Sequence, residues 1–258
     1  MTEKKVSPFF YVVKGLVRLF YGKMEVVGAE NLPQEPVIVV GNHAQMHGPI
    51  ACELFFPTAR YTWCAGEMMV IKEVPAYAYK DFWSYKPKHI RWLYKILSYL
   101  IAPLSAFVFT NADTIPVYHD ARLLSTFKRT VKALADGRSV VVFPEHDVPK
   151  NHIIFEFQDK FIDIARLYHK RTGQAVCFVP MYLAPDLRQM HLGKPVRFSP
   201  DAPMDQERQR ICEYLMTEIT DMAVKLPRHR VVPYRNVAKK LYPVNIPQEV
   251  TQDEKTGG

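Results

Sequence analysis

Cysteine is scarce in this sequence, and the spacing of the few cysteines argues against two common kinds of site. Four cysteines stand among 258 residues, and no two of them form a CxxC pair. That spacing argues against a zinc ribbon and against a dithiol redox motif. Scattered cysteines in a chain without a signal peptide are typical of a reducing compartment.

A long uncharged apolar run is also missing. No stretch reaches the ~18 uncharged apolar residues that a membrane-spanning helix needs, so we expect no multi-span membrane protein. The N-terminus places two lysines ahead of an apolar stretch, as a signal peptide does. Lys14 and Arg18 interrupt that stretch, however, and no small-residue cleavage site follows it. A position on a membrane surface stays open.

Acidic residues are in the minority. The chain has 34 Lys and Arg against 26 Asp and Glu, a net charge of +8, while its 48% hydrophobic residues are enough for a sizeable core. The positive charge favours nucleic acid, an anionic membrane surface or an acidic substrate as partner. The basic segment 228–240 carries no recognisable nucleic-acid-reading motif, so we expect no nucleic-acid partner.

Short apolar runs alternate with amphipathic stretches along most of the chain. Runs bounded by turn residues predict strands at 36–41, 61–65, 115–118, 139–143 and 175–184. Periodic apolar positions predict helices at 120–135, 159–170 and 204–226. Strands separated by helices favour an α/β fold, with a mostly parallel or mixed sheet covered by helices.

Two apolar segments leave their environment open. Residues 7–21 predict an amphipathic helix in which Lys14 and Arg18 share one stripe. This helix either lies in a membrane interface with its cations toward the headgroups, or packs on its own domain with the cations reaching water. In the very apolar segment 90–109, we expect Pro103 to end a helix, and we expect that helix to be buried in the core.

These elements suggest a domain organisation. We expect an N-terminal interfacial helix over residues 1–22, an α/β domain over residues 23–200, and a C-terminal helix with a basic, partly disordered tail over residues 201–258. Disorder is expected from Pro243 onward, where the chain is polar and rich in turn residues.

Polar residues follow two of the predicted strands. Asn42 and His43 come directly after the run at 36–41, and the cluster of Glu145, His146 and Asp147 follows the run at 139–143. The carboxyl ends of parallel strands form the usual functional edge of an α/β sheet. We therefore expect the two clusters to converge on one pocket.

Four short blocks strengthen this expectation. They are Asn42-His43, Ile115-Pro116-Val117, Phe143-Pro144-Glu145 and Val179-Pro180. In order and spacing they resemble the blocks of the glycerolipid acyltransferases, the family of 1-acylglycerol-3-phosphate acyltransferases. The resemblance covers residues 25–185.

The resemblance implies an activity. A fatty acyl group would pass from acyl-CoA or acyl carrier protein to a lysophospholipid-like or other hydroxyl or amine acceptor, with no cofactor. His43 would act as general base through a neutral imidazole, Glu145 would support the site, and Asn42 would shape the loop. The resemblance further implies a cytoplasmic protein, peripheral on the inner face of a membrane and attracted to its anionic surface.

One departure from the family pattern concerns the acid that orients the imidazole. The family has an aspartate five residues after its histidine, often before Gly-Pro. Here His47 or Gly48 occupies that place, depending on whether the chain is aligned on Gly48-Pro49 or counted from His43. In a comparable triad, replacing the orienting aspartate by an amide costs about 10⁴-fold in rate.

Further departures concern the binding of a phosphate on the acceptor. His119 stands where the family has an arginine, and His146 and Asp147 replace a glycine and the residue beyond it. Arg122 and Lys150 are the candidate substitutes, because each lies near a lost arginine in the sequence.

The altered histidines and carboxylates leave three alternatives open. In the first, Asp147 or Glu145 orients His43 from the neighbouring strand end. In the second, His43 and His47, four residues apart, bind a metal in a metal-dependent hydrolase. In the third, the chain keeps the fold and its lipid affinity but has little turnover.

Overall fold

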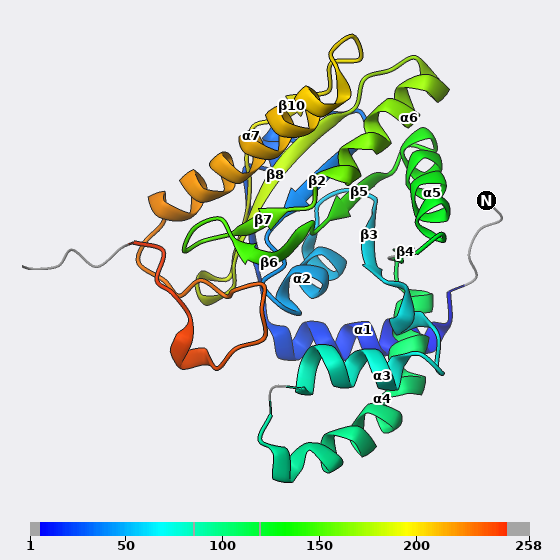
Figure 1. The fold of residues 1–258 in the computed structure, drawn as a ribbon, viewed down its shortest axis with the longest axis vertical. Helices are drawn as coiled ribbons and strands as arrows, with labels where there is room; N and C mark the ends of the chain where they lie inside the picture. The colour runs from blue at the N-terminus through cyan, green and yellow to red at the C-terminus, as the bar shows by residue number, and fades with distance from the viewer. Residues whose placement is uncertain (1–5, 85, 119, 247–258) are drawn as a thin grey trace, which may run out of the picture.

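An eight-stranded sheet forms the centre of the chain. A computed structural model describes residues 6–84, 86–118 and 120–246 (Figure 1). The strand order is β1-β9-β8-β2-β5-β3-β4, with β10 also paired to β8. The bounds are β1 (Glu25–Val27), β2 (Val37–Gly41), β3 (Arg60–Ala65), β4 (Thr114–Val117), β5 (Ser139–Val142), β8 (Cys177–Ala184), β9 (Gln189–Leu192) and β10 (Val196–Arg197).

The sheet is mixed, and its central part is parallel. Strands β8, β2, β5, β3 and β4 run parallel, whereas β9 and β10 run antiparallel to β8. Strand β1 is parallel to β9. A separate antiparallel pair is formed by β6 (Glu145–Pro149) and β7 (Phe155–Phe157). The predicted α/β class is confirmed.

Central strands are apolar on both faces because helices cover both sides. All five residues of β2 are buried, as expected for a parallel strand inside a sandwich of helices. Its Val40 lies opposite Val142 of β5 and Pro180 of β8. The carboxyl ends of β2, β5 and β8 therefore lie side by side at one edge of the sheet.

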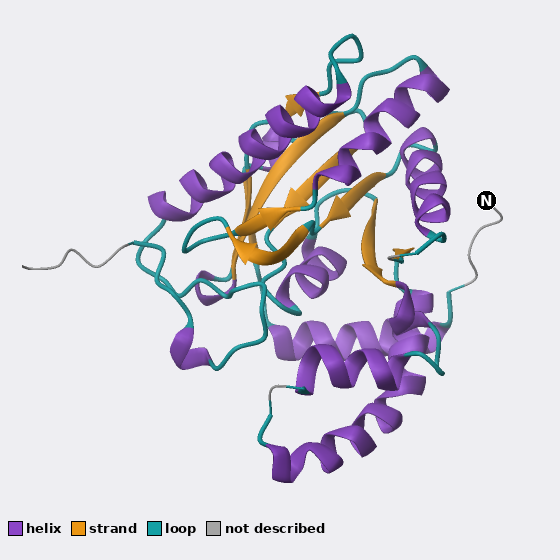
Figure 2. Cartoon of the chain, in the orientation of Figure 1, coloured by secondary structure: helices purple, strands orange, loops and turns teal. Residues whose placement is uncertain are grey.

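The two faces of the sheet contact different helices. Ile38 and Val40 of β2 share a core with α5 (Leu123–Ala135), α6 (Asp163–Thr172) and α7 (Met204–Lys225). Val37 and Val39 point the other way, toward α2 (His47–Phe55). Figure 2 shows the resulting layers, with the orange strands between purple helices. The helices predicted at 120–135, 159–170 and 204–226 correspond to α5, α6 and α7.

A third group of helices lies at one end of the sheet, at the bottom of Figure 1. It consists of α1 (Pro8–Tyr21), α3 (Val74–Ala78) with the helical turn Tyr79–Trp83 that follows it, and α4 (Arg91–Asn111). The Ser7 N–H donates to Oδ1 of Asn111 at 2.8 Å. The rings of Phe9 and Phe107 lie 5.7 Å apart, so α1 and α4 are in direct contact.

The expectation that Pro103 ends a helix is wrong, because α4 continues through it to Asn111. Proline removes one intrahelical hydrogen bond, but packing on either side can hold the helix together. Ala102 provides such packing, since it is buried in one cluster with Val74 and Ala78 of α3.

The expectation that the segment 90–109 is a core helix is also wrong. Trp92, Tyr99 and Leu100 are between 63% and 70% exposed, and the buried residues of α4 are small: Ser98, Ala102, Ser105 and Ala106. In the described part of the chain, residues Lys88–Asn111 form one helix that is long and apolar enough to cross a membrane. Arg91 and Lys95 interrupt the uncharged run in the sequence, which is why run length alone missed it.

In α1, the two basic residues Lys14 and Arg18 contact side chains of α2. Lys14 Nζ binds Glu53 Oε1 of α2 at 2.6 Å, and the Arg18 guanidinium lies 5.3 Å from the ring centroid of Phe55. The opposite face is exposed, with Leu19 at 74% and Phe20 at 86%. The helix thus packs on its own domain: Lys14 is paired, Arg18 contacts Phe55 while staying exposed, and most of the apolar side chains other than Phe10 point outward.

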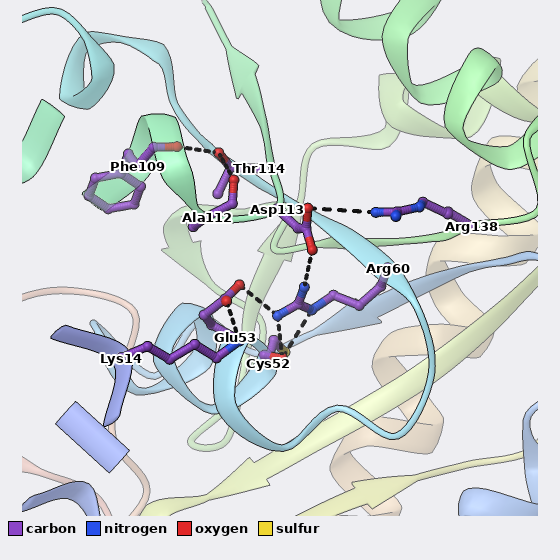
Figure 3. A network of polar contacts seen from close by, with 9 residues as sticks. All are labelled: Lys14, Cys52, Glu53, Arg60, Phe109, Ala112, Asp113, Thr114 and Arg138. Atoms are coloured by element: carbon purple, nitrogen blue, oxygen red, sulfur yellow. Dashed lines mark hydrogen bonds and ion pairs between the residues drawn. The ribbon is translucent and has the colours of Figure 1, made fainter. Parts of the chain in front are cut away.

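Figure 3 shows the polar network behind this arrangement. Arg60 is 7% exposed and donates to the Cys52 carbonyl through Nε at 3.0 Å and Nη2 at 2.7 Å. Its Nη2 also binds Oε2 of Glu53 at 2.7 Å. The second carboxylate oxygen of Glu53 holds Lys14. One carboxylate thus joins the start of β3 to the N-terminal helix.

The start of the expected disordered tail is ordered. Asn245 is fully buried; its amide donates to the Ala223 carbonyl at 2.8 Å and accepts from the His229 N–H at 2.9 Å. These bonds hold residues 243–246 against the end of α7, because a buried amide needs partners for both its oxygen and its nitrogen. The remainder of the expected disorder, residues 247–258, lies outside the described residues.

The network around Glu53 makes a stability prediction. Glu53→Gln removes the closer of the two carboxylates that pair with the buried Arg60 and leaves it only Asp113 at 3.9 Å, so we expect a loss of about 1–3 kcal/mol in the free energy of unfolding. Urea unfolding followed by circular dichroism measures this loss. Asp136→Asn, which breaks an exposed pair with Lys132 on α5, is the matched control and should leave the midpoint unchanged. Equal midpoints for the two variants would contradict the role of Glu53.

Candidate functional site

His43 lies directly beyond the carboxyl end of β2. Its ring is half-buried and meets two aromatic rings edge-on, Phe143 at 5.2 Å and Tyr234 at 6.0 Å between centroids. The ring atom Nδ1 is buried and has no hydrogen-bond partner among the described residues. His43 therefore presents an imidazole that no carboxylate orients.

The backbone after His43 adopts a conformation that is unusual outside glycine. Ala44 has φ 46° and Gln45 has φ 55°, both in the left-handed region. Such residues cost about 1–3 kcal/mol each and persist only when the surrounding structure holds them. Ala44 is fully buried, so this turn is held inside the protein. Consecutive left-handed residues beside a histidine mark this loop as a functional-site candidate.

Glu145 holds this turn from the neighbouring strand end. Its Oε2 accepts the His43 N–H at 2.5 Å, and its Oε1 accepts the Phe155 N–H of β7 at 3.1 Å. The side chain is 3% exposed. The structure thus brings the two polar clusters at 42–43 and 145–147 together. The carboxylate binds the His43 backbone, however, and does not contact the imidazole.

Asn42 ties the same loop to β8. Its Nδ2 donates to the Leu183 carbonyl at 3.1 Å, and its Oδ1 accepts the Leu183 N–H at 2.7 Å. Asn42 is 2% exposed, so this bidentate pair is sealed from water. The loop that carries His43 is therefore fixed by hydrogen bonds to β8 on one side and to β6 on the other.

Burial shifts the two titratable groups of the loop in opposite directions. It lowers the pKa of His43 to about 4 and raises the pKa of Glu145 to about 7, against the two N–H donors that favour its ionised form. The imidazole is therefore neutral at pH 7. Acidification weakens the fold through His43, whose folded-state pKa is lowered, and strengthens it through Glu145, whose folded-state pKa is raised.

Two of the predicted partners of His43 lie elsewhere. His47 begins α2, and its Nδ1 lies 3.1 Å from the Tyr21 hydroxyl of α1. The Asp147 carboxylate binds Nε of Arg235 at 3.3 Å. The pair expected between His43 and Asp147 or Glu145 is not formed: Asp147 pairs with Arg235, and Glu145 accepts two backbone N–H groups without contacting the imidazole.

Two of the remaining predicted binding residues, Arg122 and Lys150, are already paired with carboxylates. Arg122 chelates Asp120 through Nε and Nη2 at 2.8–3.1 Å, and Lys150 binds Glu213 at 3.0 Å. Within the described part of the chain, His146 of β6 makes no hydrogen bond or ion pair. The prediction for His119 lies outside the described residues.

The metal hypothesis required His43 and His47 on one helical face. The left-handed residues between them break the helix, and α2 begins only at His47. The two rings have different neighbours, Phe143 and Tyr234 for His43 but Tyr21 for His47. Across residues 6–84, 86–118 and 120–246, no group of three or more His, Cys, Asp or Glu side chains could hold a metal ion.

A C-terminal segment, residues 227–246, covers the His43 loop. Tyr234 meets the His43 ring, while Gln45 donates to the Arg235 carbonyl at 3.1 Å and accepts the Tyr242 hydroxyl at 3.1 Å. From the sequence this segment resembled a solvated basic tail, so its role at the site was missed. Its tyrosines among arginines are a signal that could have suggested a packed segment.

Comparison with known proteins gives a distant similarity at the level of structure. No protein-family model matches the chain, and no curated protein matches its sequence. Among solved structures, the chain is similar to the 1-acyl-sn-glycerophosphate acyltransferase PlsC from Thermotoga maritima, with 16% identity and a TM-score of 0.49, over 84% of this chain and 81% of that chain. At such low identity, the roles of side chains do not transfer from one chain to the other.

The left-handed turn makes a stability prediction at Ala44. Ala44→Val places a β-branched side chain in a buried left-handed position and should cost about 2–4 kcal/mol in the free energy of unfolding. Ala44→Gly relieves the same strain, which offsets the lost methyl group, so it should cost less than about 1 kcal/mol. Urea unfolding measures both variants.

Ala51 provides the matched control. It is fully buried like Ala44 but lies within helix α2, where glycine brings no relief of strain. We expect Ala51→Gly to destabilise more than Ala44→Gly, because helical glycine alone costs about 1 kcal/mol. The strained-turn interpretation fails if the two glycine variants unfold at the same urea concentration.

Proposed function

We propose that this protein is an acyltransferase that moves a fatty acyl group from a thioester to a hydroxyl or amine acceptor, with His43 as the general base. The observation that carries the proposal is the contact between two of the sequence blocks. Glu145, from the block Phe143-Pro144-Glu145, fixes the backbone N–H of His43, from the block Asn42-His43. Blocks that are distant in sequence thus build one loop at the carboxyl ends of β2 and β5, where α/β proteins bind ligands.

A general base must be unprotonated before the reaction, and burial keeps the His43 imidazole neutral by lowering its pKa. His43 takes the proton of the acceptor hydroxyl as its oxygen attacks the carbonyl carbon of the thioester. The carbon–sulfur bond then breaks, the new ester forms, and the proton passes from the imidazolium to the leaving thiolate. This sequence needs no covalent intermediate on the protein.

The lack of a carboxylate on Nδ1 limits the expected rate. When His43 takes a proton, its half-buried ring becomes a cation whose buried Nδ1 has no partner among the described residues. Burial opposes that cation, as the lowered pKa of His43 records. We therefore propose slow turnover relative to an enzyme with a complete triad, in which the orienting carboxylate contributes about 10⁴-fold.

The proposed substrates are inferred from the net charge of the protein and from the ion pairs of Arg122 and Lys150. The net charge of +8 suits an anionic donor, acyl-CoA or acyl carrier protein. Carboxylates already hold Arg122 and Lys150, so neither is available to grip an acceptor phosphate without breaking an ion pair. A lysophospholipid-like acceptor, or another hydroxyl or amine acceptor, would need other cations for its headgroup.

We propose that the protein is cytoplasmic and peripheral, on the inner face of a membrane. The support is the outward apolar face of α1 together with that of α4, where Phe20, Trp92 and Leu100 are each more than 60% exposed. Contiguous exposed apolar surface of this kind marks a membrane or protein contact. The excess of positive charge strengthens attraction to anionic headgroups.

A second candidate function is lipid binding without turnover. It is favoured by the orphaned Nδ1 of His43 and by Tyr234 of the C-terminal segment, which packs against the same ring. In this case the fold and its membrane contact are kept while the chemistry is lost. Background thioester consumption by a protein that still binds vesicles would identify this function.

The role of His43 is tested by thioester consumption with a panel of lysophospholipid, alcohol and amine acceptors. His43→Ala should lower turnover by about 10²–10⁴-fold, because it removes the general base. The matched control is His169→Ala, a histidine of α6 remote from the loop, which should keep wild-type turnover. Wild-type turnover equal to that of His43→Ala would sink the proposal.

The pH dependence of kcat/KM gives a second test. With its pKa lowered to about 4, His43 remains about nine-tenths neutral at pH 5, whereas an unshifted histidine would be about 3% neutral. We expect the acidic limb of the profile near pH 4. Glu145→Gln should keep this limb, since glutamine does not titrate. A limb near pH 6.5 that persists in Glu145→Gln would exclude His43, with its lowered pKa, as the base.

A further inference from the structure

A pocket beside the C-terminal end of α1 gathers cations without acids. We call it the headgroup pocket, and it is lined by Phe20, Tyr21, Lys23, Met24, His47, Pro185 and Arg188. An apolar groove, the α1–α4 groove, adjoins it and is lined by Val13, Leu16, Val17, Phe20, Tyr21 and Leu104. Phe20 and Tyr21 line both, so the basic pocket opens directly into the apolar groove.

The cations of the headgroup pocket have no paired counter-charge in the described part of the chain. Among the described residues, neither Lys23 nor Arg188 makes an ion pair. The Arg188 guanidinium lies over the backbone of Gly22: a Cβ added there would be 3.1 Å from its Nη1. Gly22 directly precedes Lys23 in the sequence, so the guanidinium lies beside the backbone that carries Lys23. Two neighbouring cations repel each other unless an anion lies between them.

Nearby acidic residues do not supply that anion. Asp186 precedes Arg188 in the same turn, but its carboxylate binds Nε of Arg230 at 2.9 Å. Glu25, close in sequence to Lys23, accepts Nε2 of Gln189 at 3.0 Å and does not line the pocket. His47 bonds to Tyr21 through Nδ1, which leaves its Nε2 without a partner among the described residues. No Asp or Glu lines the pocket, and its two charged lining residues are the cations Lys23 and Arg188.

We propose that the headgroup pocket and the α1–α4 groove together bind one phosphate-bearing membrane lipid. Its phosphate lies between Lys23 and Arg188, and an acyl chain lies along the groove. Arginine and lysine are the side chains that bind phosphate best, and an aliphatic groove suits an acyl chain. Phe20 and Tyr21 stand at the junction, where aromatic side chains favour the boundary between headgroup and hydrocarbon. A water-soluble phosphate would fill the pocket but leave the groove exposed.

This site is separate from the His43 loop. Phe143 and Tyr234, the ring neighbours of His43, line neither the pocket nor the groove. The inference rests on the proposed membrane association but not on acyl transfer. Lipid binding can therefore be measured whether or not the protein turns over a thioester.

The test is co-sedimentation of the full chain with vesicles. Vesicles of the phosphate-free lipid digalactosyldiacylglycerol that contain phosphatidate are compared with vesicles of the same galactolipid that carry the same negative charge as oleate, so that only the first set contains phosphate. Lys23→Gln/Arg188→Gln should weaken binding to the phosphatidate vesicles by about 10–30-fold, since each basic residue at an anionic surface contributes about tenfold or less. It should weaken binding to the oleate vesicles much less.

The control variant removes the same charge elsewhere. Lys128→Gln/Arg129→Gln also lowers the net charge by two, on the exposed face of α5 away from α1 (Figure 1). We expect it to lose less than about threefold in affinity. Equal losses for the two double variants would overturn the headgroup pocket, because general electrostatics would then explain the binding. If wild type binds no vesicle, the membrane proposal itself fails.

Two further arms identify the occupant. Leu16→Gln/Leu104→Gln alters the two exposed leucines of the groove and should weaken binding to phosphatidate vesicles without lowering the melting temperature. Glycerol 3-phosphate is the soluble probe. If it raises the melting temperature of wild type but not of Lys23→Gln/Arg188→Gln, while the groove variant binds vesicles normally, the pocket binds a free phosphate and the lipid proposal is overturned.

Discussion

The carboxylate of Glu53 determines how the N-terminal helix faces the rest of the molecule. Arg60 is almost fully buried, and a buried guanidinium has to be paired. Glu53 pairs with it and uses its second oxygen for Lys14 of α1. Because Lys14 faces the protein, the opposite, apolar face of α1 points toward solvent. The exposed surface shared by α1 and α4, the groove between them and the pocket at the end of α1 all follow from this orientation.

A similar constraint acts at the His43 loop. Two left-handed residues after His43 are stable only if the backbone before them is anchored, and Glu145 anchors it by accepting the His43 N–H. In this structure the Glu145 carboxylate binds two backbone N–H groups and does not contact the imidazole. The loop has a fixed shape, while the ring keeps a buried Nδ1 without a partner among the described residues. The loop therefore has the place and the anchoring of an active-site loop, but its histidine lacks the carboxylate partner of a fast general base.

The parts of the fold that the sequence predicted well depend on local patterns. Strands β2, β3, β4, β5 and β8 are short apolar runs between turn residues, and α5 and α7 are strongly periodic. The orientation of α1 was not predictable in this way, because periodicity shows that a helix has two faces but not which one meets the body. That choice depends on Glu53, 39 residues away from Lys14. Tyr234 reaches His43 over a still longer separation, and the basic character of its segment concealed this contact.

The side chain at position 47 lies between the His43 loop and the proposed headgroup pocket. The segment from His43 to His47 carries the proposed base at one end and a wall of the headgroup pocket at the other. In this fold the side chain at position 47 points to Tyr21 of α1, not to the ring of His43. An aspartate there would leave the imidazole unpaired and would place a negative charge beside Lys23 and Arg188. A neutral histidine keeps the pocket positive, and burial together with the nearby Lys239 lowers its pKa further. The histidine at position 47 therefore gives His43 no acidic partner and, at the same time, adds no negative charge to the proposed headgroup pocket.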